Sequence, residues 1–152
     1  MEQNIFNDDF RDFIQALNKA KVKYILVGGY SVILHGFSRS TGDMDIWVEP
    51  SSENYKKLSI AFAKFGLPIF EMSLEKFLNT NQFDVFTFGR PPVAIDIMTK
   101  LKGLNFSAAF QLSEWLELGD DFKVRVLSLN DLIKAKKAAG RLKDLNDIDH
   151  LL

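Results

Sequence analysis

A pair of glycines directly follows a short apolar run, and this arrangement strongly constrains how the chain can fold. The run from Tyr24 to Val27 has the length and composition of a buried strand, and Gly28-Gly29 then permits a sharp turn. The residues from 30 to 35 have the length of a short helix, which Gly36 would end. Glycines also let a phosphate approach bare backbone N–H groups, at the positive end of the helix that follows. A lone glycine pair is more often a simple strand-to-helix turn, so both interpretations stay open.

Two acids lie two positions apart at the start of the next apolar segment, Met44 to Val48. Because successive side chains of a strand point to opposite faces, Asp43 and Asp45 are expected to project to the same side. Two neighbouring carboxylates repel each other when both are ionised, and a hard divalent cation such as Mg²⁺ relieves that repulsion. The alternative is a solvated strand end.

A third acid stands in an otherwise apolar segment, Val93 to Met98. Asp96 needs a partner there because an unpaired buried charge is costly. One interpretation is a salt bridge to Arg39 or Arg125. The other places Asp96 beside the first two acids on a neighbouring strand, where three carboxylates can hold two divalent ions for phosphoryl or nucleotidyl transfer.

The other segments alternate between helical and extended patterns, which predicts an α/β or α+β fold with a mixed β-sheet flanked by helices. Further helices are expected over residues 8–20, 51–65, 73–78, 106–116, 130–139 and 144–151. Further strands are expected over residues 83–88 and 124–127, with a turn at 89–92 between 83–88 and 93–98. Asp8 or Asp9 is expected to cap the first helix, Gly66 to end the helix over 51–65, and Asn130 to cap the helix over 130–139.

These features together resemble the polymerase-beta-type nucleotidyltransferase superfamily. The resemblance rests on the glycine pair, thirteen intervening residues, the Asp-Met-Asp run at 43–45 and the later Asp96. The segment 39–45 is similar to small bacterial nucleotidyltransferases, which include antibiotic-modifying enzymes and the abortive-infection toxins of toxin-antitoxin systems. The segment 132–147, in which a helical lysine precedes a basic-Asp pair and another Asp, resembles the C-terminal part of those toxin-like domains. The resemblance covers residues 22–151.

The resemblance implies a nucleotidyltransferase that moves a nucleoside monophosphate from a nucleoside triphosphate to a hydroxyl acceptor. Asp43, Asp45 and Asp96 would be the catalytic residues and would hold two Mg²⁺ ions, with Asp96 as the general base. The residues expected to bind the nucleotide are Gly28, Gly29, Ser31, Arg39, Thr41, Lys136 and Lys143.

Two of these assignments have a plainer alternative. Arg39 could form a salt bridge that orients one of the acids rather than bind a phosphate. The basic cluster that contains Lys136 and Lys143 could be a solvated helix with internal ion pairs, because acids are interleaved with it. Asp144 and Asp147 are expected to hold a C-terminal helical hairpin together, over about residues 128–152.

The composition excludes several classes of protein. The formal net charge of -1 provides no global attraction for nucleic acid, and the absence of cysteine excludes disulfide scaffolds and thiolate metal sites. No apolar run approaches the roughly 20 residues that cross a bilayer. The first ten residues carry three acids and no base, which is unlike a signal or transit peptide. We therefore expect a cytoplasmic protein with one domain over residues 1–152 and no membrane partner.

The sequence leaves the acceptor open among a protein side chain, a tRNA end and a small hydroxylated molecule. The toxin-like C-terminal segment favours a toxin-antitoxin component with an antitoxin partner, and a chain with 14 phenylalanines could form a homodimer. The alternative function is a catalytically inactive nucleotide-binding or partner-binding module of the same fold. The intact set of three acids argues against that alternative.

Overall fold

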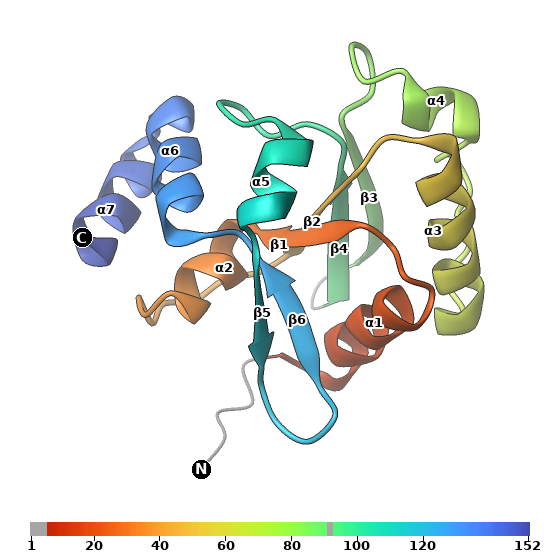
Figure 1. The fold of residues 1–152 in the computed structure, drawn as a ribbon, viewed down its shortest axis with the longest axis horizontal. Coiled ribbons are helices and arrows are strands. Elements are labelled where there is room, and N and C mark those ends of the chain that lie inside the picture. The colour runs from red at the N-terminus through yellow and green to blue at the C-terminus, as the bar shows by residue number, and fades with distance from the viewer. Residues whose placement is uncertain (1–5, 91–92) are drawn as a thin grey trace.

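A mixed six-stranded sheet forms the centre of the protein, with helices on both of its faces (Figure 1). The computed structural model describes residues 6–90 and 93–152. The strands are β1 (Tyr24–Val27), β2 (Met44–Val48), β3 (Val85–Arg90), β4 (Val93–Met98), β5 (Glu114–Glu117) and β6 (Lys123–Val126). The helices are α1 (Asp8–Lys19), α2 (Gly28–Leu34), α3 (Ser52–Phe65), α4 (Leu74–Leu78), α5 (Phe106–Leu112), α6 (Leu129–Ala139) and α7 (Leu142–Leu151).

The strands follow the order β3-β4-β2-β1-β6-β5 across the sheet. β2 pairs antiparallel with β1 and parallel with β4, and β1 pairs parallel with β6. β3 and β5 are the edge strands, each paired antiparallel with one neighbour. The mixed sheet, the flanking helices and the C-terminal helical segment confirm the predicted fold class.

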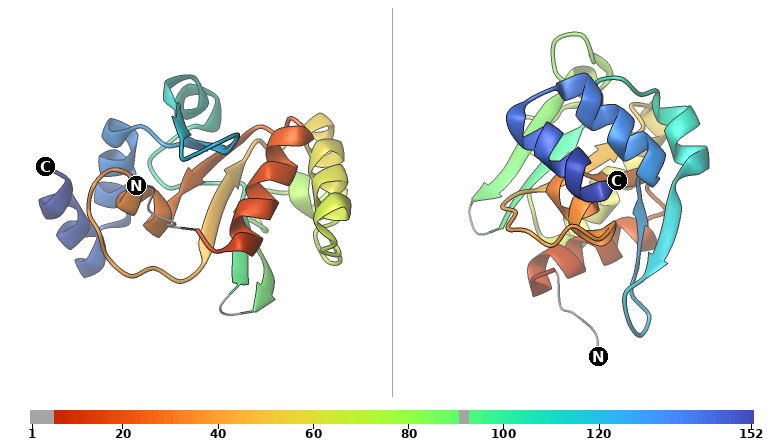
Figure 2. Two further views of the ribbon diagram at one scale, coloured as in Figure 1. Left: turned by 90° about the horizontal axis from the view of Figure 1, so that it is seen from below. Right: turned by 90° about the vertical axis from the view of Figure 1, so that its left-hand side faces the viewer.

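Two apolar cores lie on the two faces of the sheet. On one face, α1 and α3 contribute phenylalanines such as Phe13 and Phe62, whose rings meet edge to face. On the other face, α5 and α6 cover Trp47, which packs against Phe106. α6 and α7 lie at the end of the molecule opposite α3 and α4 (Figure 1), and Figure 2 shows them as an adjacent pair when that end faces the viewer.

The predicted helix over residues 106–116 is wrong in its last four residues. α5 ends at Leu112, and β5 then pairs antiparallel with β6. Trp115 of β5 is the direct cross-strand partner of Arg125, whose guanidinium lies 4.6 Å from the centre of the indole ring. This pair depends on the later strand β6 and cannot be read from residues 113–116 alone. Its cross-strand contacts outweigh the local helical preference of the segment.

Two predicted helix caps are also wrong. Asn7 rather than an aspartate caps α1, because its side chain accepts a hydrogen bond of 2.8 Å from the Phe10 N–H. Ser128 rather than Asn130 caps α6 in the same manner. Gly66 ends α3 in the left-handed conformation, as predicted. The predicted turn at 89–92 is wrong at its start, because Gly89 and Arg90 continue β3 and pair with β4; residues 91–92 lie outside the described residues.

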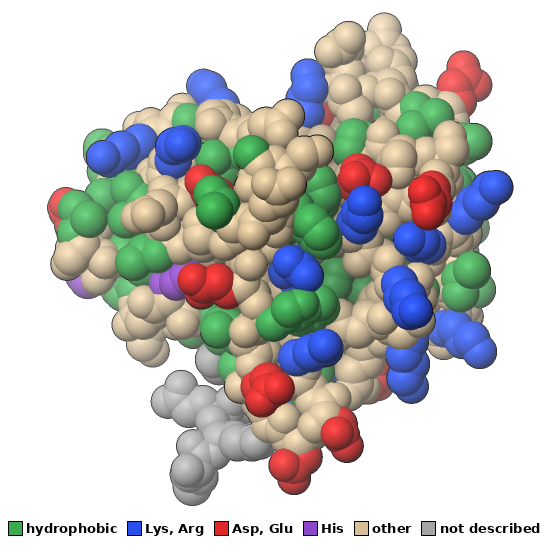
Figure 3. Space-filling model, in the orientation of Figure 1, with side chains coloured by type: hydrophobic (Ala, Val, Ile, Leu, Met, Phe, Trp, Pro, Cys, Tyr) green, Lys and Arg blue, Asp and Glu red, His purple; other side chains and the backbone are tan. Residues whose placement is uncertain are grey.

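The surface mixes charges of both signs. On the face seen in Figure 1, lysine and arginine side chains are interspersed with aspartate and glutamate (Figure 3), in keeping with the small net charge. Among the helices of the described residues, none is both long enough and apolar enough to span a bilayer.

Candidate functional site

The glycine pair lies directly against the acidic strand. Gly28 begins α2 with a positive φ of 67°, and a Cβ atom on it would overlap the carboxylate of Asp45. A Cβ atom on Gly29 would overlap the hydroxyl of Thr41. The two glycines therefore allow the end of β1 to approach both the β2 strand and the loop that precedes it.

Two of the three predicted acids form a pair on neighbouring strands. Asp45 of β2 and Asp96 of β4 are partners in a parallel register, so their side chains share one face of the sheet. The hydroxyl of Thr87, on the edge strand β3, donates a hydrogen bond of 2.7 Å to Asp96 Oδ1. The predicted alternative, a salt bridge from Asp96 to Arg39 or Arg125, does not occur, since these arginines bond elsewhere.

The environment of Asp45 disfavours its negative charge. Burial raises its pKa to about 7, and the charge of Asp96, a hydrogen bond with Asp96 and the charge of Asp43 act in the same direction. Lys136 opposes this shift. The negative charge of Asp45 beside Asp96 is therefore costly without a neighbouring cation.

Asp43 lies at the rim of the site rather than beside the other two acids. It is exposed and precedes β2, yet it lines the same cleft. Among the residues that the structure describes, no three histidine, cysteine, aspartate or glutamate side chains come together closely enough to hold a metal ion. The acidic side of the cleft is thus a half-buried pair with a third, exposed carboxylate.

The cleft, with a volume of about 540 Å³, collects almost all of the predicted site residues. Those that line it are Gly28, Gly29, Arg39, Thr41, Asp43, Asp45, Asp96, Lys136 and Lys143. The remaining one, Ser31, is fully buried, and its hydroxyl donates a hydrogen bond of 2.6 Å to the Gly28 carbonyl, so it stabilises the turn instead of facing the cleft.

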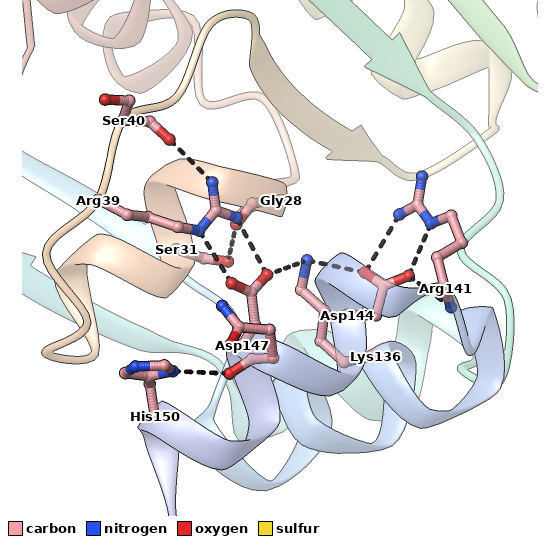
Figure 4. Close-up of polar contacts among 10 residues, drawn as sticks. Gly28, Ser31, Arg39, Ser40, Lys136, Arg141, Asp144, Asp147 and His150 are labelled. Atoms are coloured by element: carbon pink, nitrogen blue, oxygen red, sulfur yellow. Dashed lines mark hydrogen bonds and ion pairs between the residues drawn. The ribbon is translucent and has the colours of Figure 1, made fainter.

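A chain of ion pairs forms the wall opposite the acids (Figure 4). Asp147 accepts two hydrogen bonds from Arg39, at 2.9 and 3.0 Å, and its Oδ2 lies 3.1 Å from Lys136 Nζ. The same lysine nitrogen lies 3.2 Å from Asp144, which also binds the Arg141 side chain at 2.6 Å. The expectation that Asp144 and Asp147 hold the C-terminal hairpin together is confirmed.

Asp144 of this wall favours its ionised form. Burial alone would raise the pKa of Asp144, but hydrogen bonds from Arg141 and Lys136 outweigh it and hold the pKa below its ordinary value. Three cations and two carboxylates meet here, which leaves one positive charge in surplus, and the exposed Lys143 adds another. The wall is thus a fixed, net positive surface that faces the glycine turn.

Sequence reasoning missed three members of this arrangement. Thr87 had a usable signal, because in the alternating segment from Val85 to Phe88 it falls on the face opposite the phenylalanines. Arg141 was visible only as part of a basic cluster. The bond from Asp147 to Arg39 joins residues 108 positions apart and has no local signal.

A family comparison agrees with this geometry. Residues 8–151 match the family described as "Nucleotidyltransferase of unknown function (DUF6036)". The chain belongs to this nucleotidyltransferase family. No curated protein matches the sequence significantly.

Two solved structures share the fold at low sequence identity. TM1012 from Thermotoga maritima, described as a candidate nucleotidyltransferase, is 17% identical, with a TM-score of 0.60 over 93% of this chain and 88% of that protein. The lincosamide antibiotic adenylyltransferase LnuA, solved with lincomycin bound, is also 17% identical, with a TM-score of 0.57 over 98% of each chain. At this identity the similarity establishes the fold, and it agrees with the predicted superfamily.

Proposed function

We propose that this nucleotidyltransferase moves a nucleoside monophosphate from a nucleoside triphosphate to a hydroxyl group of an acceptor. The observation that carries the proposal is the meeting, in one cleft, of the glycine turn, the carboxylate pair and the net positive wall. In the reaction, the hydroxyl oxygen attacks the α-phosphorus and forms a new P–O bond. The bond from that phosphorus to the bridging oxygen breaks, and pyrophosphate leaves.

The positive wall suits the triphosphate. Arg39 presents a planar fork of donors, the geometry that favours phosphate, and its bonds to Asp147 fix its position before any ligand arrives. Lys136 is fixed by the same carboxylate and by Asp144. Cations that are positioned in advance lose little side-chain freedom when a nucleotide binds, so more of their interaction serves positioning.

The acidic pair suits the acceptor hydroxyl. Asp96 would take the hydroxyl proton, and the hydrogen bond from Thr87 to one of its oxygens fixes the orientation of the carboxylate. Asp45 lies between Asp96 and the glycine turn, and we expect the α-phosphate to bind beside it.

The resemblance implies two Mg²⁺ ions, which Asp43, Asp45 and Asp96 would hold. Half-buried carboxylates on neighbouring strands, with Asp45 in a position that disfavours its charge, form the kind of oxygen donor set that a hard divalent cation favours. Asp43 supplies a further oxygen ligand only if it turns inward from the rim. When bound, the ions would neutralise the charge that develops on the attacking and leaving oxygens.

LnuA is described as an adenylyltransferase, so ATP is the first nucleotide to test. The toxin-like subtype, an antitoxin partner and a homodimer stay predictions from the sequence. Cytoplasmic localisation also stays a prediction.

The test is a labelling assay. The protein is incubated with each α-³²P-labelled nucleoside triphosphate in a cell lysate, with Mg²⁺ or with EDTA, and nucleotide affinity is measured in parallel by calorimetry. We expect Mg²⁺-dependent labelling that Asp45→Asn reduces at least about 100-fold, whereas Asp120→Asn, in the distant turn between β5 and β6, has no effect. Nucleotide binding without any labelling would favour the inactive binding module. Absence of both binding and labelling would refute nucleotidyl transfer.

A further inference from the structure

A second groove, of about 490 Å³, follows the outer edge of β3. One side is the edge strand itself, and the other is the loop that joins α3 to α4. Its lining is mainly apolar and includes Leu67, Phe70, Phe83, Val85, Phe86 and Phe88. The charged side chains in the lining are Glu71 and Lys76, and the ammonium of Lys76 lies 5.4 Å from the centre of the Phe83 ring.

The groove borders the acidic side of the cleft at β3. Val85 lines both spaces. Thr87 lines the groove and also donates the hydrogen bond to Asp96. A molecule that lies in the groove and extends over β3 at Val85 and Thr87 would therefore approach the carboxylate that would take the acceptor proton.

The rim of the groove exposes apolar side chains that a merely structural loop would bury. Phe70 is 80% exposed and has a positive φ of 35°, a conformation that is strained for a bulky residue. Val85 is also exposed, across the groove from it. Exposed apolar side chains that border a groove mark binding surfaces more often than isolated ones do.

We propose that this groove binds the acceptor, and that the acceptor is a small molecule with an aromatic or other apolar body and a free hydroxyl group. The inference rests on the proposed nucleotidyl transfer and narrows its acceptor. The volume and the lining, mostly apolar with a few polar groups, match the sites that bind small molecules. The end of a tRNA would require several cations beside Asp96, whereas the groove offers Lys76 as its one lysine or arginine among the described lining residues.

The geometry divides the substrates between the two ends of the site. The triphosphate faces the positive wall, and the apolar body of the acceptor faces Phe70 and its neighbours. The acceptor hydroxyl then extends past Val85 toward Asp96, loses its proton to that carboxylate and attacks the α-phosphorus.

The test uses 3-phenyl-1-propanol, a primary alcohol with an apolar ring, and glycerol, a polyol without one. Binding to the ATP-saturated protein is followed by backbone amide NMR. We expect 3-phenyl-1-propanol, but not glycerol, to shift the amides of β3 and of residues 66–73. Phe70→Asn should weaken that binding at least about fivefold, because asparagine tolerates the positive φ but lacks the ring. The control Leu112→Asn replaces a residue of α5 that is 62% exposed, and it should change nothing.

The outcomes separate this inference from the proposed function. The acceptor groove is supported if Phe70→Asn binds ATP as tightly as the wild type in calorimetry, binds 3-phenyl-1-propanol more weakly and no longer forms adenylylated 3-phenyl-1-propanol. ATP binding with probe shifts elsewhere, or with label found only on protein or RNA, overturns the inference and leaves nucleotidyl transfer standing. Failure to bind any nucleotide refutes the proposed function itself.

Discussion

Replacing Asp147 by asparagine tests the ion-pair wall most directly. Asp147 is buried and neutralises two cations, Arg39 and Lys136, at distances of 2.9 to 3.1 Å. Asparagine keeps the size of the side chain but removes its charge, so Lys136, which is only 8% exposed, retains Asp144 as its one acidic partner. Removing one member of a buried ion pair costs about 3–5 kcal/mol, and the partial exposure of Arg39 places the expected loss near about 3 kcal/mol. For a protein of this length, that corresponds to a decrease in Tm of roughly 6–12 °C.

The assay is urea unfolding at pH 7, with the free energy of unfolding obtained by linear extrapolation. Two variants serve as references. Lys136→Met removes a cation but leaves Asp144 bonded to Arg141 and Asp147 bonded to Arg39, so it should cost only about 1 kcal/mol. Glu53→Gln removes the surface pair with Lys57, in which the glutamate is 84% exposed, and should cost less than about 0.5 kcal/mol. If Asp147→Asn costs no more than Glu53→Gln, the wall is a set of surface charges and our account of it is wrong.

Three further predictions concern the acidic side of the cleft. The folded-state pKa of Asp45 is about 7 and its ordinary value is 3.8, so the stability contributed by its protonated form is complete below about pH 4 and is lost as the pH rises through 7. Asp45→Asn should therefore become more stable than the wild type between pH 5 and 8, by at most about 4 kcal/mol in urea titrations. Equal stability of the two proteins at pH 8 would contradict the raised pKa. Gly29→Ala should destabilise the protein by about 1–3 kcal/mol in thermal melts, because the added Cβ atom would overlap Thr41. The control Gly42→Ala should be neutral, because a Cβ atom there has no other atom within 4 Å. Equal melting temperatures for the two variants would show that the loop containing Thr41 moves aside. Thr87→Val removes the hydrogen bond to Asp96, so it should lower kcat about tenfold while nucleotide affinity measured by calorimetry stays unchanged. An unaltered kcat would exclude a role for Thr87 in orienting the Asp96 carboxylate.

The sequence was sufficient to predict those parts of the site that depend on local spacing. The two-residue interval between Asp43 and Asp45 predicted that both would face one site, and both line one cleft although Asp43 precedes β2. The glycine pair indicated a strand-to-helix turn, which is observed between β1 and α2. Asp96 could be placed because an acid in an apolar strand needs a nearby polar group; the Thr87 hydroxyl provides one, and the register with Asp45 puts both acids on one face.

The features that sequence reasoning missed depend on partners far along the chain. β5 is a strand because Trp115 meets Arg125 of β6, not because of its own four residues. Asp43 was expected beside the other acids, and its position at the rim follows from the path of the loop rather than from strand alternation. The bond from Asp147 to Arg39 depends on how α7 packs against the rest of the protein, which no local pattern determines.

The bond between Arg39 and Asp147 makes completion of the cleft depend on α7. Arg39 lies early in the chain, and the carboxylate that fixes it belongs to α7, 108 residues later. The six strands of the sheet precede α6 in the sequence, so the sheet and its acidic pair can be translated before the positive wall is complete. At that stage the nascent chain contains the acids but lacks the residues of α6 and α7 that complete the positive wall. Under the proposed function, nucleotide binding would therefore require that α7 has been translated and has packed against the rest of the protein.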